Sequence, residues 1–251
     1  MEMPFLSILG EEIEAELILF DLDGTLLDAS TRHRNLARAR IDTIGRLVGG
    51  RTVDEWARLS GVDKDTFEID PQGPLARAPR REDLTVATAA IYVSGHSWHA
   101  ARELAKRAYK EADRLQETLY RPSLMEGAGE VLKSLKEGGF KLGIATNGES
   151  TSASAMMKEL GLLDLFDVIL GADSVVEAKP APEMALLACE RVGVPPDSAL
   201  FVGDQQEDMR AGRTASVKAV VSVNNSDQAV MGLADLSLNS VADIRVVPRD
   251  K

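Results

Sequence analysis

Short apolar runs bounded by polar residues recur along this chain. Continuous apolar runs of this length indicate strands that are buried on both faces, as in a parallel sheet. We therefore expect the runs to be the core strands of one sheet. The runs are Leu17–Phe20, Lys141–Ala145, Val168–Leu170, Ala199–Val202 and Lys218–Val223.

Helical patterns lie between these runs in the second half of the chain. Ala128–Glu137 carries its apolar residues on one side and ends at two glycines, which is a helix stop signal. Ser152–Leu160 also ends at a glycine, and Pro182–Val192 has a proline at its start and Gly193 just after its end. This alternation of strands and helices predicts an α/β fold with a doubly wound, Rossmann-like parallel sheet.

The stretch from Thr31 to Tyr120 breaks that alternation. Arg34–Leu47 and Trp98–Leu119 have helical patterns, and no strand separates them. We therefore expect an α/β core domain formed by residues 1–30 and 121–251, with an inserted α-helical domain at residues 31–120.

Two segments near the chain ends carry weaker signals. Gly10–Glu16 is short and acidic, and we expect it to contribute little to the core. The tail from Val246 to Lys251 shows no pattern and is expected to be frayed.

Composition restricts the class of protein. Hydrophobic residues make up 44% and charged residues 27% of the 251 residues, which is typical of a soluble globular protein and excludes disorder throughout. The 40 Asp and Glu outnumber the 29 Lys and Arg, giving a net charge of −11. Such an acidic chain repels phosphate backbones, so we expect no nucleic-acid partner. A small anionic substrate stays compatible with it, because charge within a cleft can oppose the global sign.

The sequence also indicates a cytoplasmic location. No apolar run approaches the ~18 residues of a membrane-spanning helix, and the start of the chain has no basic leader, so we expect no membrane association. Cys189 is the only cysteine and cannot form an internal disulfide, which favours a reducing compartment. Its apolar neighbours predict a buried position on a helix. The oligomeric state cannot be read from this sequence.

The first candidate for chemistry is the segment Asp21–Thr25, which directly follows an apolar run. Asp21 and Asp23 are two residues apart and project to the same side of the strand end. The carboxyl ends of strands are where ligands bind in open α/β sheets. Gly24 allows a sharp turn at this point. We therefore expect a functional site here rather than a polar turn.

Two more carboxylates follow another apolar run. Asp204 and Asp208 are four residues apart, which places them one above the other if a helix begins there. Together with Asp21 and Asp23 they would form an oxygen-rich cluster, in which like charges raise one another's pKa. A divalent cation resolves that conflict, and oxygen ligands favour Mg²⁺. The alternative is that these acids only interact with the dipole of a helix N-terminus.

Two further segments have groups that can bind phosphate. Thr146–Gly148 offers a hydroxyl, an amide and backbone N–H groups at a strand-to-helix turn. Lys179 precedes Pro180, which favours an extended backbone at the lysine, and its ammonium is a point charge for phosphate. Taken alone, each segment is also compatible with an ordinary turn or a solvated lysine.

In this order and placement the four segments resemble the motifs of the haloacid dehalogenase superfamily, in its phosphatase-like branch with a helical cap after the first motif (phosphoglycolate phosphatase-like). The resemblance covers Leu17–Asp28 and about Pro122–Val223, and it does not extend to the sequence of the insert. The position of the insert between the first two motifs is similar to that of the family's cap. The matching residues are Asp21-Leu22-Asp23-Gly24-Thr25, Thr146-Asn147-Gly148, Lys179-Pro180, and Gly203-Asp204 with Asp208.

This resemblance implies roles for the matching residues. Asp21 would attack phosphorus and form an aspartyl-phosphate, and Asp23 would act as general acid and then as general base. Mg²⁺ would be bound by the Asp21 carboxylate, the Asp23 backbone carbonyl and Asp204, with Asp208 binding directly or through water. The phosphoryl oxygens would be neutralised by Thr146, Asn147 and Lys179.

Two residues depart from the family pattern. Gln205 stands where many relatives have a small hydroxyl residue, and Ser216 stands about where a glycine often follows the last helix. Neither departure removes a group that the implied mechanism needs. They leave the subfamily open.

The resulting hypothesis is a Mg²⁺-dependent phosphatase that hydrolyses a phosphate monoester of a small soluble metabolite. A phosphomutase acting on a sugar phosphate would keep every core residue and stays an alternative, as does, less favourably, a non-catalytic binding or regulatory protein with the same fold. A haloacid dehalogenase would not need Asp23. No sequence pattern in residues 31–120 indicates a particular substrate.

Other polar residues of the insert suggest no chemistry. His96 and His99 are three residues apart, but zinc would need further ligands. Lys64 has no neighbours that support Schiff-base chemistry. Four arginines are spaced around one predicted helix, and we expect them to form a solvated face. They are Arg32, Arg34, Arg38 and Arg40.

Overall fold

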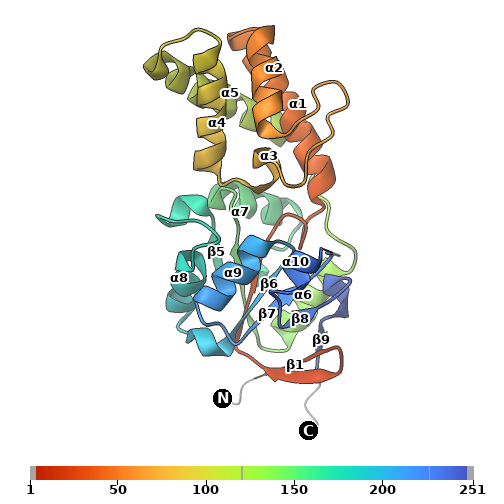
Figure 1. Ribbon diagram of the computed structural model, residues 1–251. Helices are drawn as coiled ribbons and strands as arrows, with labels where there is room; N and C mark the ends of the chain where they lie inside the picture. The colour runs from red at the N-terminus through yellow and green to blue at the C-terminus, as the bar shows by residue number, and fades with distance from the viewer. Residues whose placement is uncertain (1–3, 120, 226, 248–251) are drawn as a thin grey trace. The chain divides into compact units, whose positions relative to one another are not determined.

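The computed structural model describes residues 4–119, 121–225 and 227–247. The chain divides into two compact units (Figure 1). An α/β unit comprises Met1–Asp28 and Pro122–Lys251, and a helical unit comprises Ala29–Arg121. No helix in the described ranges is long and apolar enough to cross a membrane.

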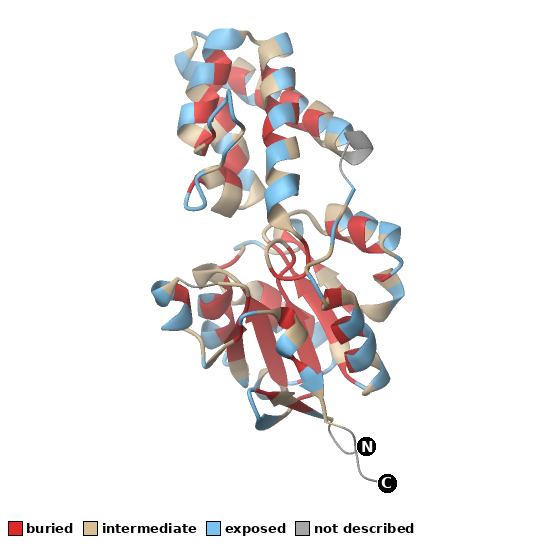
Figure 2. Cartoon of the chain, turned by 90° about the vertical axis from the view of Figure 1, so that its right-hand side faces the viewer, coloured by how far each residue is buried: buried red, intermediate tan, exposed pale blue. Residues whose placement is uncertain are grey.

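The α/β unit is built on a six-stranded parallel sheet with the strand order β5-β4-β3-β6-β7-β8. All four residues of β3 are fully buried, as expected for a strand covered on both faces (Figure 2). The expected doubly wound parallel sheet is thus confirmed. The strands are β3 (Leu17–Phe20), β4 (Lys141–Ala145), β5 (Val168–Leu170), β6 (Ala199–Gly203), β7 (Ala219–Ser222) and β8 (Leu236–Ser237).

Helices cover both faces of this sheet. The chain runs from β4 through α7 to β5, and then returns through α8 to β6 on the far side of β3. Because parallel crossovers are right-handed, these opposite directions place α7 and α8 on opposite faces. Leu17 and Leu19 of β3 pack in one core cluster with residues of α8 and α9. The helices are α6 (Ala128–Glu137), α7 (Ser150–Glu159), α8 (Glu183–Val192), α9 (Gln206–Thr214) and α10 (Gln228–Met231), with short 3₁₀ turns at Leu163–Leu165, Ala172–Ser174, Pro196–Ser198 and Val241–Asp243.

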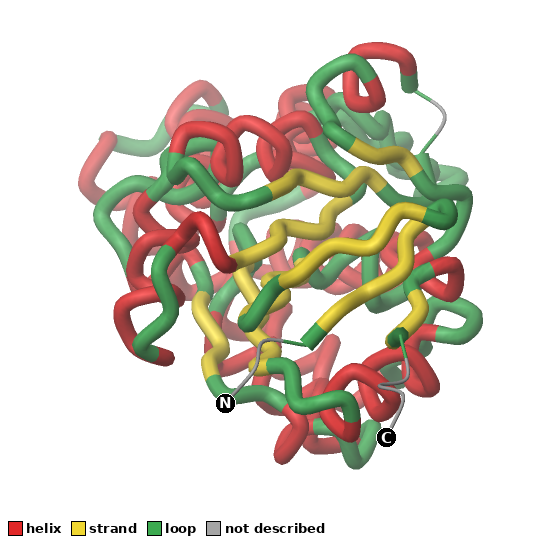
Figure 3. Tube along the Cα trace, turned by 90° about the horizontal axis from the view of Figure 1, so that it is seen from below, coloured by secondary structure: helices red, strands yellow, loops and turns green. Residues whose placement is uncertain are grey.

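A second, three-stranded antiparallel sheet lies at the amino ends of the parallel strands (Figure 3). It joins β1 (Phe5–Ile8) to β2 (Glu11–Glu14) on one side and to β9 (Arg245–Val246) on the other. The acidic segment forms the exposed to half-buried strand β2, which the sequence did not predict. Leu9 and Gly10 both have positive φ and close a tight hairpin before it. The expectation of a frayed tail is wrong at Val246, and residues 248–251 lie outside the described ranges.

The helical unit confirms the expected α-helical insert. Its core packs fully buried Trp56 and Tyr109 among small and aliphatic residues of its helices. Two of its longer helices, α2 and α4, were not predicted from the sequence. The helices are α1 (Ala29–Leu47), α2 (Gly50–Ser60), α3 (Pro74–Arg77), α4 (Arg80–Val93) and α5 (Trp98–Leu119).

A buried polar network crosses the core of the helical unit. Arg40 Nη1 donates to Asp83 Oδ2 at 2.5 Å, and the Tyr109 hydroxyl donates to Asp83 Oδ1 at 2.9 Å. Trp56 Nε1 donates to the Tyr109 hydroxyl at 3.0 Å, and the Arg40 guanidinium lies 4.0 Å from the centre of the Tyr109 ring. The expected solvated arginine face is therefore wrong for Arg40, which is 2% exposed, whereas Arg38 is exposed.

Candidate active site

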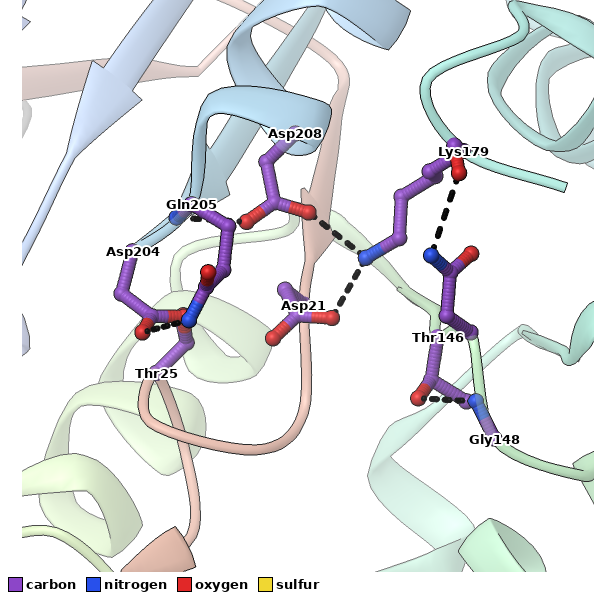
Figure 4. A network of polar contacts seen from close by, with 9 residues as sticks. Asp21, Thr25, Thr146, Gly148, Lys179, Asp204, Gln205 and Asp208 are labelled. Carbon is purple, nitrogen blue, oxygen red and sulfur yellow. Dashed lines mark hydrogen bonds and ion pairs between the residues drawn. The ribbon is translucent and has the colours of Figure 1, made fainter. Parts of the chain in front are cut away.

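Three carboxylates meet at the carboxyl ends of β3 and β6, which are neighbours in the sheet. Asp21 follows β3, Asp204 follows β6, and Asp208 lies in the first turn of α9. One oxygen from each lies within 4.8 Å of those of the other two (Figure 4). Asp21 is 5% exposed and Asp208 is fully buried. The structure thus brings together three of the four predicted acids in one buried cluster.

Lys179 connects two of these carboxylates. Its Nζ donates to Asp21 Oδ1 at 2.5 Å and to Asp208 Oδ1 at 2.6 Å (Figure 4). The side chain is 3% exposed and reaches the cluster from the loop before α8. Burial alone would lower the pKa of Lys179, but the two carboxylates outweigh it and hold the pKa above its ordinary value. Lys179 is therefore a buried ammonium ion beside the predicted nucleophile.

The charges of this cluster do not balance within the protein. Burial raises the pKa of Asp21 well above its ordinary value, although Lys179 opposes that shift. Burial and the neighbouring Asp208 raise the pKa of Asp204 to about 7. With all three carboxylates ionised, the single ammonium leaves two negative charges uncompensated. Because all three groups offer oxygen ligands, the cluster suits a divalent metal ion.

Two glycines make room for the carboxylates. A Cβ atom on Gly24 would lie 2.4 Å from Asp204 Oδ2, and one on Gly203 would lie 2.3 Å from Asp208 Oδ2. Gly24 also has a φ of +86°, which side chains rarely adopt. Both positions therefore require glycine for the approach of the acids, and Gly24 requires it for backbone shape as well.

The carboxylate of Asp204 is held by donors from two loops. Thr25 Oγ1 donates to Asp204 Oδ1 at 3.3 Å, and Gln205 Nε2 donates to Asp204 Oδ2 at 2.8 Å. The backbone N–H of Gln205 donates to Asp208 Oδ2 at 2.9 Å. The start of α9 and the turn after β3 therefore orient the same acids.

The predicted phosphate-binding residues lie on the adjoining loops. Thr146 follows β4, is 2% exposed, and accepts a hydrogen bond from the Gly148 N–H at 3.0 Å. Asn147 Nδ2 donates to the main-chain carbonyl of Lys179 at 3.1 Å, which ties the β4 loop to the lysine. Asp23 is half-buried in the turn after β3, and its carboxylate is not a member of the three-acid cluster.

Two asparagines that the sequence reasoning missed also reach this edge of the sheet. Asn224 Nδ2 donates to the main-chain carbonyl of Gly24 at 2.9 Å, and Asn225 Nδ2 donates to that of Asp204. Both follow β7, the neighbour of β6. Two amides directly after a predicted core strand were the available signal. They brace the turn after β3 and the loop after β6.

Comparison with known proteins places these features in context. Residues 15–216 match the family model of the haloacid dehalogenase-like hydrolases. The chain is 27% identical over 215 residues to a phosphoglycolate phosphatase of Nitrosococcus oceani, covering 82% of this chain and 83% of the relative. It is 30% identical over 221 residues to an N-acetylmuramic acid 6-phosphate phosphatase of Pseudomonas aeruginosa, covering 83% and 81%.

The fold is similar to that of a solved structure as well. A crystal structure of a predicted phosphoglycolate phosphatase from Haemophilus somnus has a TM-score of 0.66 to this chain at 22% identity. The match covers 91% of this chain and 96% of the other. At this identity the likeness concerns the fold.

Proposed function

Because the chain belongs to the haloacid dehalogenase-like hydrolases, we propose that it is a Mg²⁺-dependent phosphatase that forms an aspartyl-phosphate on Asp21. Its substrate is a phosphate monoester of a small metabolite. The two relatives described above are phosphatases of different small molecules, which supports the reaction and leaves the individual ester open.

One observation carries this proposal. Asp21 is buried at a strand end with one carboxylate oxygen held by Lys179, and two further acids lie beside it. A nucleophile, a fixed cation and a cluster of oxygen ligands are the parts that phosphoryl transfer needs, since catalysis there depends on positioning and charge stabilisation.

In the first step, the second oxygen of the Asp21 carboxylate attacks phosphorus. The bond between phosphorus and the ester oxygen breaks, and that oxygen takes a proton from Asp23, so the product leaves as a neutral alcohol. Lys179 keeps Asp21 oriented and places positive charge beside the reacting group. Thr146 and Asn147 bind the phosphoryl oxygens.

In the second step, Asp23 acts as a base. Its carboxylate takes a proton from a water molecule, whose oxygen attacks the phosphorus of the aspartyl-phosphate. The bond between phosphorus and Asp21 breaks, inorganic phosphate leaves, and both aspartates return to their starting states. The same acid thus serves both half-reactions.

The residues that would hold Mg²⁺ are Asp21, Asp204 and Asp208, together with the main-chain carbonyl of Asp23. When bound, the ion supplies positive charge that offsets the charge of the transferring phosphoryl group. The two uncompensated negative charges of the cluster support a divalent ion in this position.

We further propose that the two compact units are separate domains, an α/β hydrolase domain of residues 1–30 and 121–251 and a helical cap domain of residues 31–120. The separation by internal contacts falls at Asp28 and Pro122, within two residues of these boundaries, which supports this division.

The test is phosphate release from p-nitrophenyl phosphate and from a panel of small phosphate monoesters, in Mg²⁺ or EDTA. We expect release by the wild-type chain in Mg²⁺, loss in EDTA, and loss in Asp21→Asn. The matched control is Asp164→Asn, which changes an exposed aspartate and should leave the rate unchanged. A folded wild-type protein that releases no phosphate from any ester would overturn the proposal, and an isomerised sugar phosphate in its place would identify a mutase.

A further inference from the structure

Gln205 lies between two acids of the cluster in the sequence and contacts both of them in space. Its side-chain Nε2 donates to Asp204 Oδ2 at 2.8 Å, and its backbone N–H donates to Asp208 Oδ2 at 2.9 Å. The side chain folds back toward the carboxylate of Asp204 (Figure 4). One residue thus holds both carboxylates that follow β6.

The other end of the same amide has no hydrogen-bond partner. Gln205 Oε1 is buried and accepts no hydrogen bond from any residue that the structure describes. Buried side-chain acceptors in native proteins are nearly always satisfied by protein groups, ordered water or ions. An acceptor left over beside three carboxylates therefore points to a ligand of the cluster.

The orientation of the amide follows from the chemistry of its neighbour. An ionised carboxylate only accepts hydrogen bonds, so the NH₂ group of Gln205 faces Asp204 and the carbonyl oxygen faces the other way. A ligand can therefore satisfy Oε1 by donating a hydrogen bond or, if it is a cation, by coordinating the oxygen directly. Because Mg²⁺ usually retains several waters in protein sites, we take a cation-bound water as the donor.

We propose that Gln205 is a positioning residue of the metal site, with Nε2 fixing the carboxylate of Asp204 and Oε1 accepting a hydrogen bond from a water on the cation. The inference rests on the proposed Mg²⁺ dependence. It assigns Gln205 to the metal site as a residue that contacts the ligands of the cation and not the cation itself. Groups that orient metal ligands in this way commonly contribute about 10- to 100-fold to metal affinity.

The test is a calorimetric titration of the metal-free protein with Mg²⁺, without substrate. Gln205→Met keeps the length of the side chain and removes both its donor and its acceptor. We expect it to weaken Mg²⁺ binding by about 10-fold or more. The control is Gln206→Met, because the side chain of the adjacent glutamine accepts a hydrogen bond from Arg210 on the surface. The Mg²⁺ affinity of this variant should equal that of the wild type.

A second variant guards against a folding defect. Gln205→Asn keeps an amide but withdraws it by one methylene group, so that it no longer reaches Asp204, and we expect the same weakening. Thermal melting in EDTA establishes that each variant is folded. A crystal structure with Mg²⁺ should show a cation-bound water within hydrogen-bonding distance of Gln205 Oε1.

The outcomes separate the inference from the proposed function. Wild-type Mg²⁺ affinity in both folded Gln205 variants, or an equal loss in Gln206→Met, overturns the role of Gln205 and leaves the phosphatase proposal standing. A wild-type protein that binds no Mg²⁺ overturns both. Phosphate release without any effect of the Gln205 variants on Mg²⁺ affinity overturns the inference alone.

Discussion

Asp204 is fixed by groups from three separate loops. Thr25 and Gln205 donate to its carboxylate, and Asn225 donates to its main-chain carbonyl. The hydrogen bonds from Thr25 and Gln205 favour the ionised form of the carboxylate, yet burial and the proximity of Asp208 still raise its pKa to about 7. In the metal-free protein, the Asp204 carboxylate therefore binds a proton near neutral pH. A metal cation must compete with that proton.

That competition predicts a pH-dependent affinity for Mg²⁺. Below pH 7 the cation must displace a proton from Asp204, whereas above it the carboxylate is already ionised. We expect the apparent Mg²⁺ affinity to rise as the pH is raised from 6 to 8 and then to level off. Calorimetric titrations in a series of buffers measure this, and an affinity that does not change over the range would contradict it.

The same shift sets the sign of a stability change. The folded form binds more protons than the unfolded chain between the ordinary pKa of an aspartate, 3.8, and about 7. The contribution of Asp204 to stability is therefore fully present below the lower value and is lost as the pH rises through the upper one. Melting of the EDTA-treated protein should consequently show this loss, and Mg²⁺ should reverse it.

The positions of some site residues could be predicted from the sequence, and the contacts of others could not. Asp21, Asp204 and Asp208 follow apolar strands, so their convergence was expected from the rule that carboxyl ends of parallel strands share one edge. The pairing of Lys179 with both Asp21 and Asp208 depends on the path of the loop before α8. No periodicity encodes such a path. The contacts of Gln205 depend on a rotamer, which the sequence also leaves open.

At the scale of single elements, the end of α9 carries backbone strain. Ser216 follows this helix with a φ of 58°, in the left-handed region that favours glycine. The sequence had already marked this position as one where a glycine is common in similar chains. The residue is exposed, so a substitution there tests the backbone with little change in packing.

Ser216→Gly should therefore stabilise the protein. Relief of the left-handed conformation outweighs the greater freedom of glycine in the unfolded chain, and we expect a gain in the free energy of unfolding of roughly 0.5–1 kcal/mol. The matched control is Ser152→Gly within α7, which should lose about the same amount. Urea unfolding followed by circular dichroism measures both, and a loss in Ser216→Gly would refute the argument.

The buried pair between α1 and α4 predicts a large effect in the helical unit. Asp83→Asn keeps the shape of the side chain but leaves the Arg40 charge uncompensated in the core. Breaking a buried ion pair on one side costs about 3–5 kcal/mol. Both tryptophans, Trp56 and Trp98, lie in this unit, so tryptophan fluorescence during urea unfolding reports on it selectively.

An exposed pair in the same unit provides the control for that measurement. Lys64 Nζ lies 2.5 Å from Asp54 Oδ1, and both side chains are about half exposed. Because exposed ion pairs contribute little, Lys64→Met should leave the fluorescence transition unchanged. Equal midpoints for Asp83→Asn and the wild type would show that the network around Tyr109 is not important for stability.

Strands were predicted best where a continuous apolar run marks them in the sequence. β3, β4 and β5 match their expected bounds, because they are mainly apolar runs and most of their residues are buried. The hairpin of β1 and β2 was missed, since β2 has three glutamates and its strand is specified by the turn at Leu9 and Gly10. Arg40 was misread because its partner Asp83 is distant in sequence.

At the scale of the whole molecule, the small sheet connects the two ends of the described chain. Leu6 of β1 pairs with Val246 of β9, and Ile244, just before β9, is 3% exposed. A Cβ on Gly138 would lie only 2.8 Å from Val246 Cγ1, so β9 also packs closely against the end of α6. Ile244 thus belongs to the core of the α/β unit, and β9 pairs with β1 beside it.

Removal of the C-terminal segment from Ile244 onward should destabilise the protein. Loss of the buried Ile244 side chain alone is expected to cost roughly 1.5–3 kcal/mol, and the pairing with β1 is lost in addition. A chain ending at Val247 keeps β9 and serves as the control. The melting temperature measured by circular dichroism tests this prediction. An unchanged melting temperature in the chain that lacks Ile244 would contradict it.

The position of this small sheet has a practical consequence. β1 and β9 lie at the amino ends of the parallel strands, whereas the carboxylate cluster lies at their carboxyl ends. A tag, a fused protein or a surface anchor attached at either end would therefore be kept away from the reacting groups by the length of the strands. The Val247 N–H also donates to the main-chain carbonyl of Phe5, so a short linker joining these two segments would allow new ends to be opened in an exposed loop.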